Sequence, residues 1–91
     1  MIVVNESLST ESFNSTEFQY FPNPVNKNLI IKSQKLIDHL TVYNIFGQRI
    51  ITKSPNTKIE KLDFIGLNQG VYFVEVTIND LTKIIKIIKR D

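Results

Sequence analysis

The feature that most constrains the fold is a succession of short runs rich in Ile, Val, Phe and Tyr, separated by residues that break regular structure. The runs occupy residues 18–21, 28–33, 40–46, 48–53, 58–64, 71–78 and 81–90. β-branched and aromatic side chains favour strands, and short strands that alternate with Gly, Pro and Asn are typical of sandwiches and barrels. The sequence therefore predicts an all-β domain with one strand for each run and no long helix.

The run at residues 71–78 alternates most strictly between apolar and other side chains. The apolar side chains at every second position are Tyr72, Val74, Val76 and Ile78. Successive side chains of a strand point to opposite faces, so these residues should share the buried face. Asn79 and Asp80 then supply a two-residue hairpin turn, and Gly47 supplies the positive φ of another tight hairpin.

The last run, residues 81–90, allows two interpretations. Its isoleucines and lysines also fit a short amphipathic helix that could lie on an anionic membrane. We favour a strand, because isoleucine is β-branched, the run is short and a hairpin turn precedes it. Apolar residues would then occupy both faces, and the lysines would discourage edge-to-edge pairing with other chains. Residues 35–40 are expected to form a loop between strands.

Length and composition set the limits of the domain. The chain has 91 residues, of which 42% are hydrophobic, and it contains no Cys and no Trp. One modest core of Ile, Val, Leu and Phe must therefore hold the fold without disulfides or thiolate metal sites. No apolar run approaches the roughly 18 residues that span a bilayer, so the chain is not expected to be membrane-spanning.

Residues 1–17 differ in composition from the rest of the chain. Ser, Thr, Asn and Glu dominate there, and the charged side chains are Glu6, Glu11 and Glu17. Such a segment is expected to be a flexible linker from an upstream domain, with the folded domain over residues 18–91. Its first residues lack the basic region and the long apolar region of a signal peptide.

Side chains that support catalysis are few. The one histidine, His39, follows Asp38 in a predicted loop, and no serine has the Gly-x-Ser-x-Gly context of a hydrolase. Carboxylates such as Glu60, Asp63 and Glu75 fall on strand faces, where charge normally meets water. No calcium-binding run of aspartates and no phosphate-binding glycine loop is present. We therefore expect no enzyme, no cofactor and no metal site.

The C-terminal run is basic. Lys83, Lys86, Lys89 and Arg90 stand there against one carboxylate, Asp91. A basic strand can bind nucleic acid or an anionic membrane surface. No aromatic side chain is interleaved with these cations, and no RNA-binding signature is present. The prediction is a solvated strand face that does not bind nucleic acid.

Three local patterns stand out. In the first, Pro22-Asn23-Pro24, each proline fixes φ, removes an amide donor and pushes the preceding residue toward extended backbone. This segment is expected either to lead the chain into the domain or to be a rigid surface element that a partner reads. The second pattern is the hairpin of residues 42–50, and the third is residues 67–76, where a glycine leads into a buried strand.

Together and in this order, these patterns resemble the C-terminal sorting domain of the type IX secretion system. The resemblance rests on Tyr20-Phe21-Pro22-Asn23-Pro24-Val25, Leu29-Ile30-Ile31, Val42-Tyr43-Asn44 with Gly47-Gln48, Leu67 with Gly70-Val71-Tyr72-Phe73-Val74, and the basic strand from Lys83. It covers residues 18–91. The Tyr-Phe pair before the prolines departs from the single Tyr that is usual in the family.

The resemblance implies a seven-stranded, immunoglobulin-like β-sandwich, in agreement with the runs described above. It also implies a transport signal at the C-terminus of a cargo protein of Bacteroidota, which directs the cargo from the periplasm across the outer membrane. The implied partners are the outer-membrane translocon, a shuttle protein, a surface sortase that removes the domain, and the cargo domain on its N-terminal side. The cargo would be secreted or held at the cell surface, and the chain would be the end of that larger protein.

We expect the machinery to recognise surface shape and strand edges. The candidate recognition residues are Pro22, Asn23, Pro24, Gly47, Gln48, Gly70, Lys83, Lys86, Lys89 and Arg90. The main alternative is an accessory β-sandwich that binds sugar or mediates adhesion, with Phe73 and Phe13 as candidate stacking residues. A second alternative is a structural spacer that oligomerises through an exposed edge strand.

Overall fold

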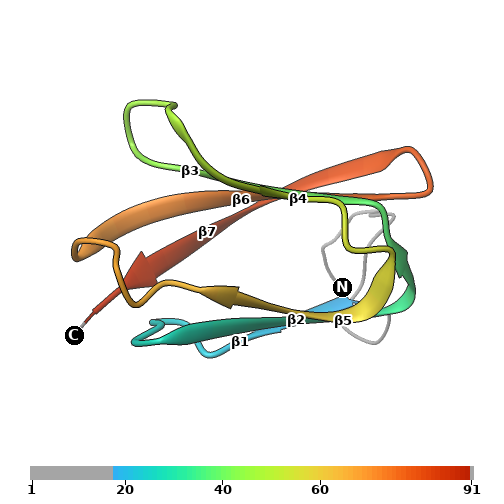
Figure 1. The fold of residues 1–91 in the computed structure, drawn as a ribbon, viewed down its shortest axis with the longest axis horizontal. Coiled ribbons are helices and arrows are strands. Elements are labelled where there is room, and N and C mark those ends of the chain that lie inside the picture. The colour runs from blue at the N-terminus through green and yellow to red at the C-terminus, as the bar shows by residue number, and fades with distance from the viewer. Residues whose placement is uncertain (1–17, 91) are drawn as a thin grey trace, which may run out of the picture.

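The structure, a computed structural model, describes residues 18–90, and this part of the chain is entirely β (Figure 1). The strands are β1 (Phe18–Phe21), β2 (Asn28–Ile37), β3 (His39–Tyr43), β4 (Arg49–Lys53), β5 (Thr57–Asp63), β6 (Gly70–Ile78) and β7 (Leu81–Lys89). They form a three-stranded sheet in the order β1-β2-β5 and a four-stranded sheet in the order β4-β3-β6-β7. Figure 1 shows the two sheets as facing layers, which is the expected immunoglobulin-like sandwich.

The core lies between the sheets and follows from the alternation of side chains along the strands. In β6, the residues predicted to share a face are the buried ones, and in β7 the buried apolar residues are Ile85 and Ile87. The other strands and the loops contribute Phe18, Val25, Leu29, Ile31, Ile37, Leu40, Val42, Leu62 and Phe64. Full burial of one such side chain stabilises the fold by about 1.5–3 kcal/mol, so this layer holds the sheets together without a disulfide.

The loops gather at the two ends of the sandwich because every strand pair is antiparallel. One end, at the left of Figure 1, holds the β1–β2, β3–β4 and β5–β6 loops together with the end of β7. We call it the loop end. The opposite end holds the β2–β3 and β4–β5 connections and the β6–β7 turn.

The two sheets are joined along one side by the segment that follows β1. Val25 forms an isolated parallel bridge with Lys89 of β7. The Val25 N–H donates to the Ile88 carbonyl at 2.8 Å, and the Val25 carbonyl accepts from the Arg90 N–H at 2.8 Å. The segment that follows β1 is therefore linked to the last strand through backbone hydrogen bonds, although β1 and β7 belong to different sheets.

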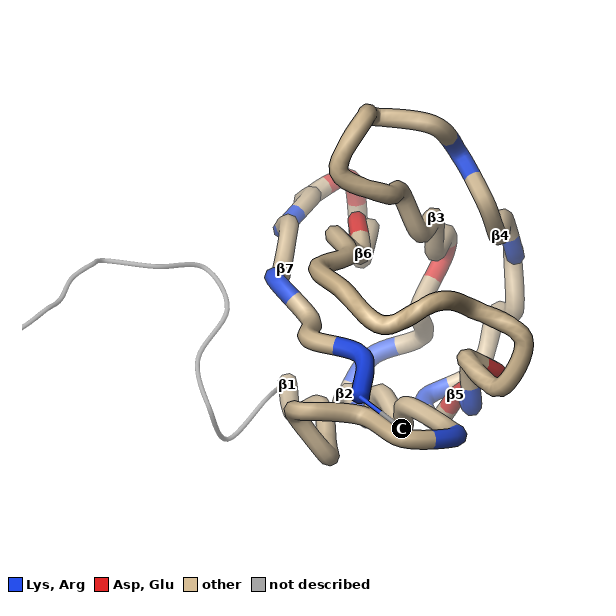
Figure 2. The backbone as a smooth tube through the Cα atoms, turned by 90° about the vertical axis from the view of Figure 1, so that its left-hand side faces the viewer, with Lys and Arg blue, Asp and Glu red and all other residues tan. Residues whose placement is uncertain are grey.

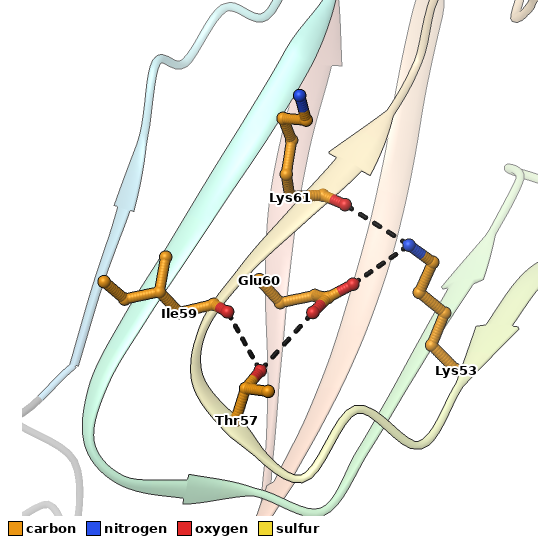
Figure 3. Close-up of polar contacts among 5 residues, drawn as sticks. All are labelled: Lys53, Thr57, Ile59, Glu60 and Lys61. Carbon is orange, nitrogen blue, oxygen red and sulfur yellow. Dashed lines mark hydrogen bonds and ion pairs between the residues drawn. The ribbon is translucent and has the colours of Figure 1, made fainter.

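On the other side of the sandwich, a lysine of β4 reaches β5 (Figure 3). Lys53 Nζ lies 2.9 Å from Glu60 Oε2 and donates to the Lys61 carbonyl at 3.3 Å. Thr57 Oγ1 donates to the Ile59 carbonyl at 2.9 Å and lies 3.4 Å from the second Glu60 oxygen. The Glu60 side chain is only 19% exposed, so these hydrogen bonds offset the cost of withdrawing its carboxylate from water.

The end of β2 corrects one expectation. Residues 35–40 were expected to form a loop, but β2 continues to Ile37 and β3 begins at His39, with Asp38 alone between them. The register with β5 shifts between Lys32 and Ile37. A β-bulge interrupts the alternation of side chains, so the exposed stretch before Ile37 does not look like a strand in the sequence.

The C-terminal run is a strand and not an amphipathic helix. β7 pairs with β6 continuously from Gly70 opposite Lys89 to Ile78 opposite Leu81. The turn between them has positive φ at Asn79 (51°) and Asp80 (68°), the geometry of a two-residue hairpin turn whose twist matches that of the strands. The interpretation as a strand, which rested partly on the hairpin turn before this run, is therefore confirmed.

Candidate recognition surface

Most of the residues predicted to be recognised meet at the loop end. The β1–β2 loop contains the Pro-Asn-Pro segment, and the β3–β4 loop contains Gly47 and Gln48. Gly70 is the first residue of β6, directly after the β5–β6 loop. Lys89 and Arg90 lie at the end of β7, on the same end of the sandwich. Figure 2 looks onto this end, with the three loops at the front of the view. The antiparallel topology brings these segments together from distant parts of the sequence.

The Pro-Asn-Pro segment does not form the extended element that the sequence predicts. The backbone bends at Asn23 and Pro24, and the Phe21-Pro22 and Asn23-Pro24 peptide bonds are both cis. The expectation of an extended segment was wrong, because the local preference of residues that precede proline takes no account of the hydrogen bonds that Asn23 and Val25 make to β7.

Asn23 instead hydrogen-bonds to the outer edge of β7. Its side-chain Nδ2 donates to the Lys86 carbonyl at 3.1 Å, and its Oδ1 accepts from the Ile88 N–H at 3.0 Å. A side-chain amide offers one donor and one acceptor side by side, as a backbone peptide does. With the two bonds from Val25, the edge of β7 is occupied from the Lys86 carbonyl to the Arg90 N–H. The structure thus gives Asn23 an intramolecular role, and its contact with a partner stays a prediction.

The β3–β4 connection is a five-residue loop and not the tight hairpin that was expected, since β3 ends at Tyr43 and β4 begins at Arg49. Asn44 organises this loop. Its Oδ1 accepts from the N–H groups of Phe46 (2.9 Å) and Gln48 (3.0 Å), and its Nδ2 donates to Gln48 Oε1 at 2.7 Å. The expected positive φ is present at Gly47, at +81°.

The β5–β6 turn carries a tyrosine corner, a feature of immunoglobulin-like sandwiches in which a tyrosine near the start of a strand bonds back to the preceding turn. The Tyr72 hydroxyl donates to the Asn68 carbonyl at 2.7 Å. The Tyr72 ring packs edge-on against Phe64 with 5.7 Å between ring centroids. Gly70 has a φ of +149°, a backbone conformation that side-chain-bearing residues rarely adopt.

A groove lies between the β3–β4 loop and the β5–β6 turn. Its volume is about 210 Å³, and it is lined by Asn44, Ile45, Phe46, Asn68, Gln69, Gly70, Val71 and Tyr72. Two of the three sequence patterns therefore form the two walls of one concave surface. Each wall combines amide side chains with apolar ones, Asn44 with Ile45 and Phe46 on one side and Asn68 and Gln69 with Val71 and Tyr72 on the other.

The lysines of β7 do not form one basic face. They are spaced three residues apart, and side chains alternate along a strand, so neighbouring lysines point to opposite sides. Lys86 is exposed, Lys83 is half-buried, and Lys89 is buried with its Nζ donating to the Arg90 carbonyl at 3.4 Å. Lys83 also lies toward the opposite end of the sandwich. The tail strand thus presents separate cations and not a continuous basic stripe.

On the outer face of the four-stranded sheet, Tyr43 lies beside Phe73 in the register of β3 with β6. The Tyr43 hydroxyl donates to Glu75 Oε1 at 3.1 Å. This hydrogen bond raises the pKa of Tyr43 above its ordinary value of 10.0, with smaller contributions from partial burial and from the Glu75 charge, while Arg49 opposes them. Phe73 is half-buried, and Phe13, the other candidate stacking residue, lies outside the described residues.

The residues considered for catalysis stay apart from this surface. His39 lies at the opposite end of the sandwich, with its Nδ1 3.0 Å from Ser54 Oγ. Among residues 18–90, no group of three or more His, Asp or Glu side chains is placed to hold a metal ion. The same residues include no helix long and apolar enough to cross a bilayer.

Asn44, Ile45 and Phe46 line the groove but were not among the residues predicted to be recognised. Asn44, three residues before Gly47, could have indicated this loop. Asn side chains commonly accept hydrogen bonds from backbone amides two residues further on. An apolar pair between these turn residues has no place in a two-residue hairpin. It would have indicated a longer loop with exposed apolar side chains.

A family model described as the secretion system C-terminal sorting domain matches residues 19–90. No curated protein sequence matches the chain.

Among solved structures, one from a study of PorZ of Porphyromonas gingivalis superposes with a TM-score of 0.69 at 18% sequence identity. The match covers 91% of this chain but only 13% of that chain. PorZ is described there as an essential bacterial surface component of the type IX secretion system of this oral bacterium. At this identity the likeness concerns the fold.

Proposed function

Because the chain belongs to the family of type IX secretion C-terminal sorting domains, we propose that it directs an attached cargo protein from the periplasm across the outer membrane. The observation that carries the proposal is the extent of the family match, which runs from β1 to the residue after β7 and so covers one complete sandwich. The family consists of sorting signals and not of enzymes. Membership implies passage across the outer membrane to the cell surface or the medium.

The proposed partners are the outer-membrane translocon, a shuttle protein and a surface sortase. The loop end supports recognition of a folded domain, because residues from three loops form one surface there. Among the recognition residues, Pro22, Pro24, Gln48 and Arg90 are exposed on this surface. Gly47 and Gly70 would act by setting the loop shape.

We further propose that the sortase removes the domain by cleaving within residues 1–17. Support comes from composition, since Ser, Thr, Asn and Glu dominate this stretch and the family match begins after it. Proteases prefer exposed polar segments without packing partners. The cargo would then lie N-terminal to residue 18 and would be released or held at the surface.

The test is an export assay in a Bacteroidota host. Residues 18–91 are fused to the C-terminus of a reporter that carries an ordinary Sec signal, and the reporter is measured in the periplasm, on the surface and in the medium. We expect the reporter to leave the periplasm only when the domain is attached. The matched control is the same fusion in a strain without the type IX translocon, where the reporter should stay periplasmic.

A fusion that stays in the periplasm with a folded, protease-resistant domain would contradict the proposal. Export that does not depend on the translocon would contradict it as well. Deletion of the last strand is a poor negative control, because β7 supplies the buried Ile85 and Ile87. Such a deletion would confuse loss of recognition with loss of folding.

A further inference from the structure

We propose that Ile45 and Phe46, at the tip of the β3–β4 loop, are the apolar anchor by which the domain docks on a partner protein. The partner surface should have an apolar pocket bordered by carboxylates. This inference rests on the proposed sorting function and names the part of the domain that the secretion machinery would bind.

Exposure is the first observation. Phe46 is 80% exposed, more than any other large apolar side chain among the described residues, and Ile45 beside it is 62% exposed, close to Ile65 and Ile84 at 61%. Single exposed apolar residues are common on protein surfaces. Two adjacent ones at the tip of a loop are different, because a compact partner can bury both. Aromatic residues that insert into a partner's pocket supply much of the affinity of protein interfaces.

The loop is also held in shape before any partner binds. Two backbone hydrogen bonds of Asn44 add to the three made by its side chain. The Asn44 N–H donates to the Gln48 carbonyl, and the Gly47 N–H donates to the Asn44 carbonyl, both at 3.0 Å. A loop that is already ordered loses little conformational entropy on binding. The sequence thus uses Asn44, Gln48 and Gly47 to fix the backbone that displays two apolar side chains to water.

The groove beside the tip gives the surface a complementary shape. Ile45 and Phe46 form part of one wall, and Asn68 and Gly70 form part of the other. A partner that receives the Phe46 ring could place a ridge in this groove, and its polar groups would meet the amides of the Asn68 wall. A projecting anchor next to a groove defines one docking orientation.

Charge around the loop end indicates the chemistry of the partner. Arg49 follows the loop directly, and Lys27 and Arg90 lie on the same end, all three exposed. Among the described residues of this end the carboxylate is Asp63, whose Oδ1 accepts the Ile65 N–H at 2.8 Å. The end is therefore cationic, and a surface with carboxylates around an apolar pocket would be complementary to it.

The experiment compares single variants in the reporter fusion. Phe46→Ala should lower the surface and medium fraction about tenfold or more, as loss of an interface anchor does. Its melting temperature should equal that of the parent domain, because the ring is 80% exposed. Ile84→Ala is the matched control, since Ile84 is 61% exposed on β7, away from the loop end, and its export should be unchanged.

Two further variants separate the parts of the argument. Phe46→Leu keeps an apolar anchor and should retain most of the export, whereas Phe46→Asp should abolish it. Arg49→Glu should reduce export with no change in melting temperature, which tests the charge of the partner.

Failure of the inference and failure of the sorting function have different signatures. If the parent fusion itself stays periplasmic, the proposed function is wrong. If the parent is exported and Phe46→Ala is exported equally, the loop tip is not the anchor. Equal losses for Phe46→Ala and Ile84→Ala would also overturn the inference, because the effect would then be one of general surface hydrophobicity.

Discussion

Two asparagine side chains act in this domain as if they were pieces of backbone. Asn44 accepts two amide protons within its own loop, and Asn23 pairs with the edge of β7 near the other end of the chain. Both use the donor and acceptor that an amide presents side by side. The sequence pattern predicts only that these residues form turns, whereas their hydrogen-bond partners determine their structural roles.

At the residue scale, Tyr43→Phe should change how stability depends on pH. The raised pKa of Tyr43 means that the folded state favours the neutral phenol, so this stabilisation is present below about pH 10 and is lost as pH rises through the raised pKa. The variant lacks this hydroxyl. The difference in unfolding free energy between parent and variant should therefore be constant near neutral pH and shrink in alkali.

Urea unfolding followed by circular dichroism, from neutral pH to about pH 11, measures this difference directly. The other tyrosines and the lysines titrate in both proteins, so their effects cancel in the comparison. A difference that stays constant over the whole range would show that the hydrogen bond to Glu75 contributes nothing to the folded state.

At the scale of the elements, the edge of β7 is the most informative feature. One half of it is bonded by Asn23 and Val25, and the other half, toward the β6–β7 turn, runs along the exposed Leu81 and Ile84. Unpaired strand edges tend to pair with other chains, and native proteins limit this by covering or charging them. Asn23 and Val25 together cover the half of the edge nearest the C-terminus.

Asn23→Ala should open that half of the edge. The Ile88 amide loses its acceptor, so its hydrogen exchange should accelerate, while the Arg90 amide keeps its bond to the Val25 carbonyl. Loss of two hydrogen bonds should lower the unfolding free energy by about 1–2 kcal/mol. Amide exchange followed by NMR gives the residue-level readout, and Asn26→Ala, an exposed asparagine in the same loop, is the control. Unchanged protection at Ile88 would refute the assigned role.

At the scale of the whole molecule, the sandwich should fold as one cooperative unit, because its core takes side chains from all strands except β4. Deletion of residues 82–91 removes two core isoleucines and exposes the edge of β6. Each lost isoleucine costs about 2–5 kcal/mol, and small domains have only about 5–15 kcal/mol of net stability. The truncated chain should therefore show no cooperative thermal transition by circular dichroism.

Deletion of residues 90–91 alone is the comparison, because it leaves both isoleucines and the β6–β7 pairing in place. This chain should melt cooperatively, at a slightly lower temperature. A cooperative transition in the longer deletion would mean that the three-stranded sheet and β6 fold without β7, and truncation would then become a valid probe of recognition.

The sequence by itself determined the number of strands, the buried face of β6 and the hairpin turn at Asn79 and Asp80. These depend on local chemistry, namely the period of two along a strand and the φ values that turn residues tolerate. The family resemblance could also be recognised from the sequence, because each of its motifs is a run of consecutive residues. The continuation of β2 to Ile37 could not be read, since a bulge interrupts the period there.

Only the tertiary structure decided where the motifs meet and which groups they contact. The Asn23 side chain bonds to β7, Lys53 of one sheet bonds to β5 of the other sheet, and the β3–β4 loop lies beside the β5–β6 turn. Such pairings depend on how two sheets stack and on which loops share an end, and no local period encodes them. The exposure of Phe46 is another feature that the sequence does not predict, because it follows from the shape that Asn44 gives the loop.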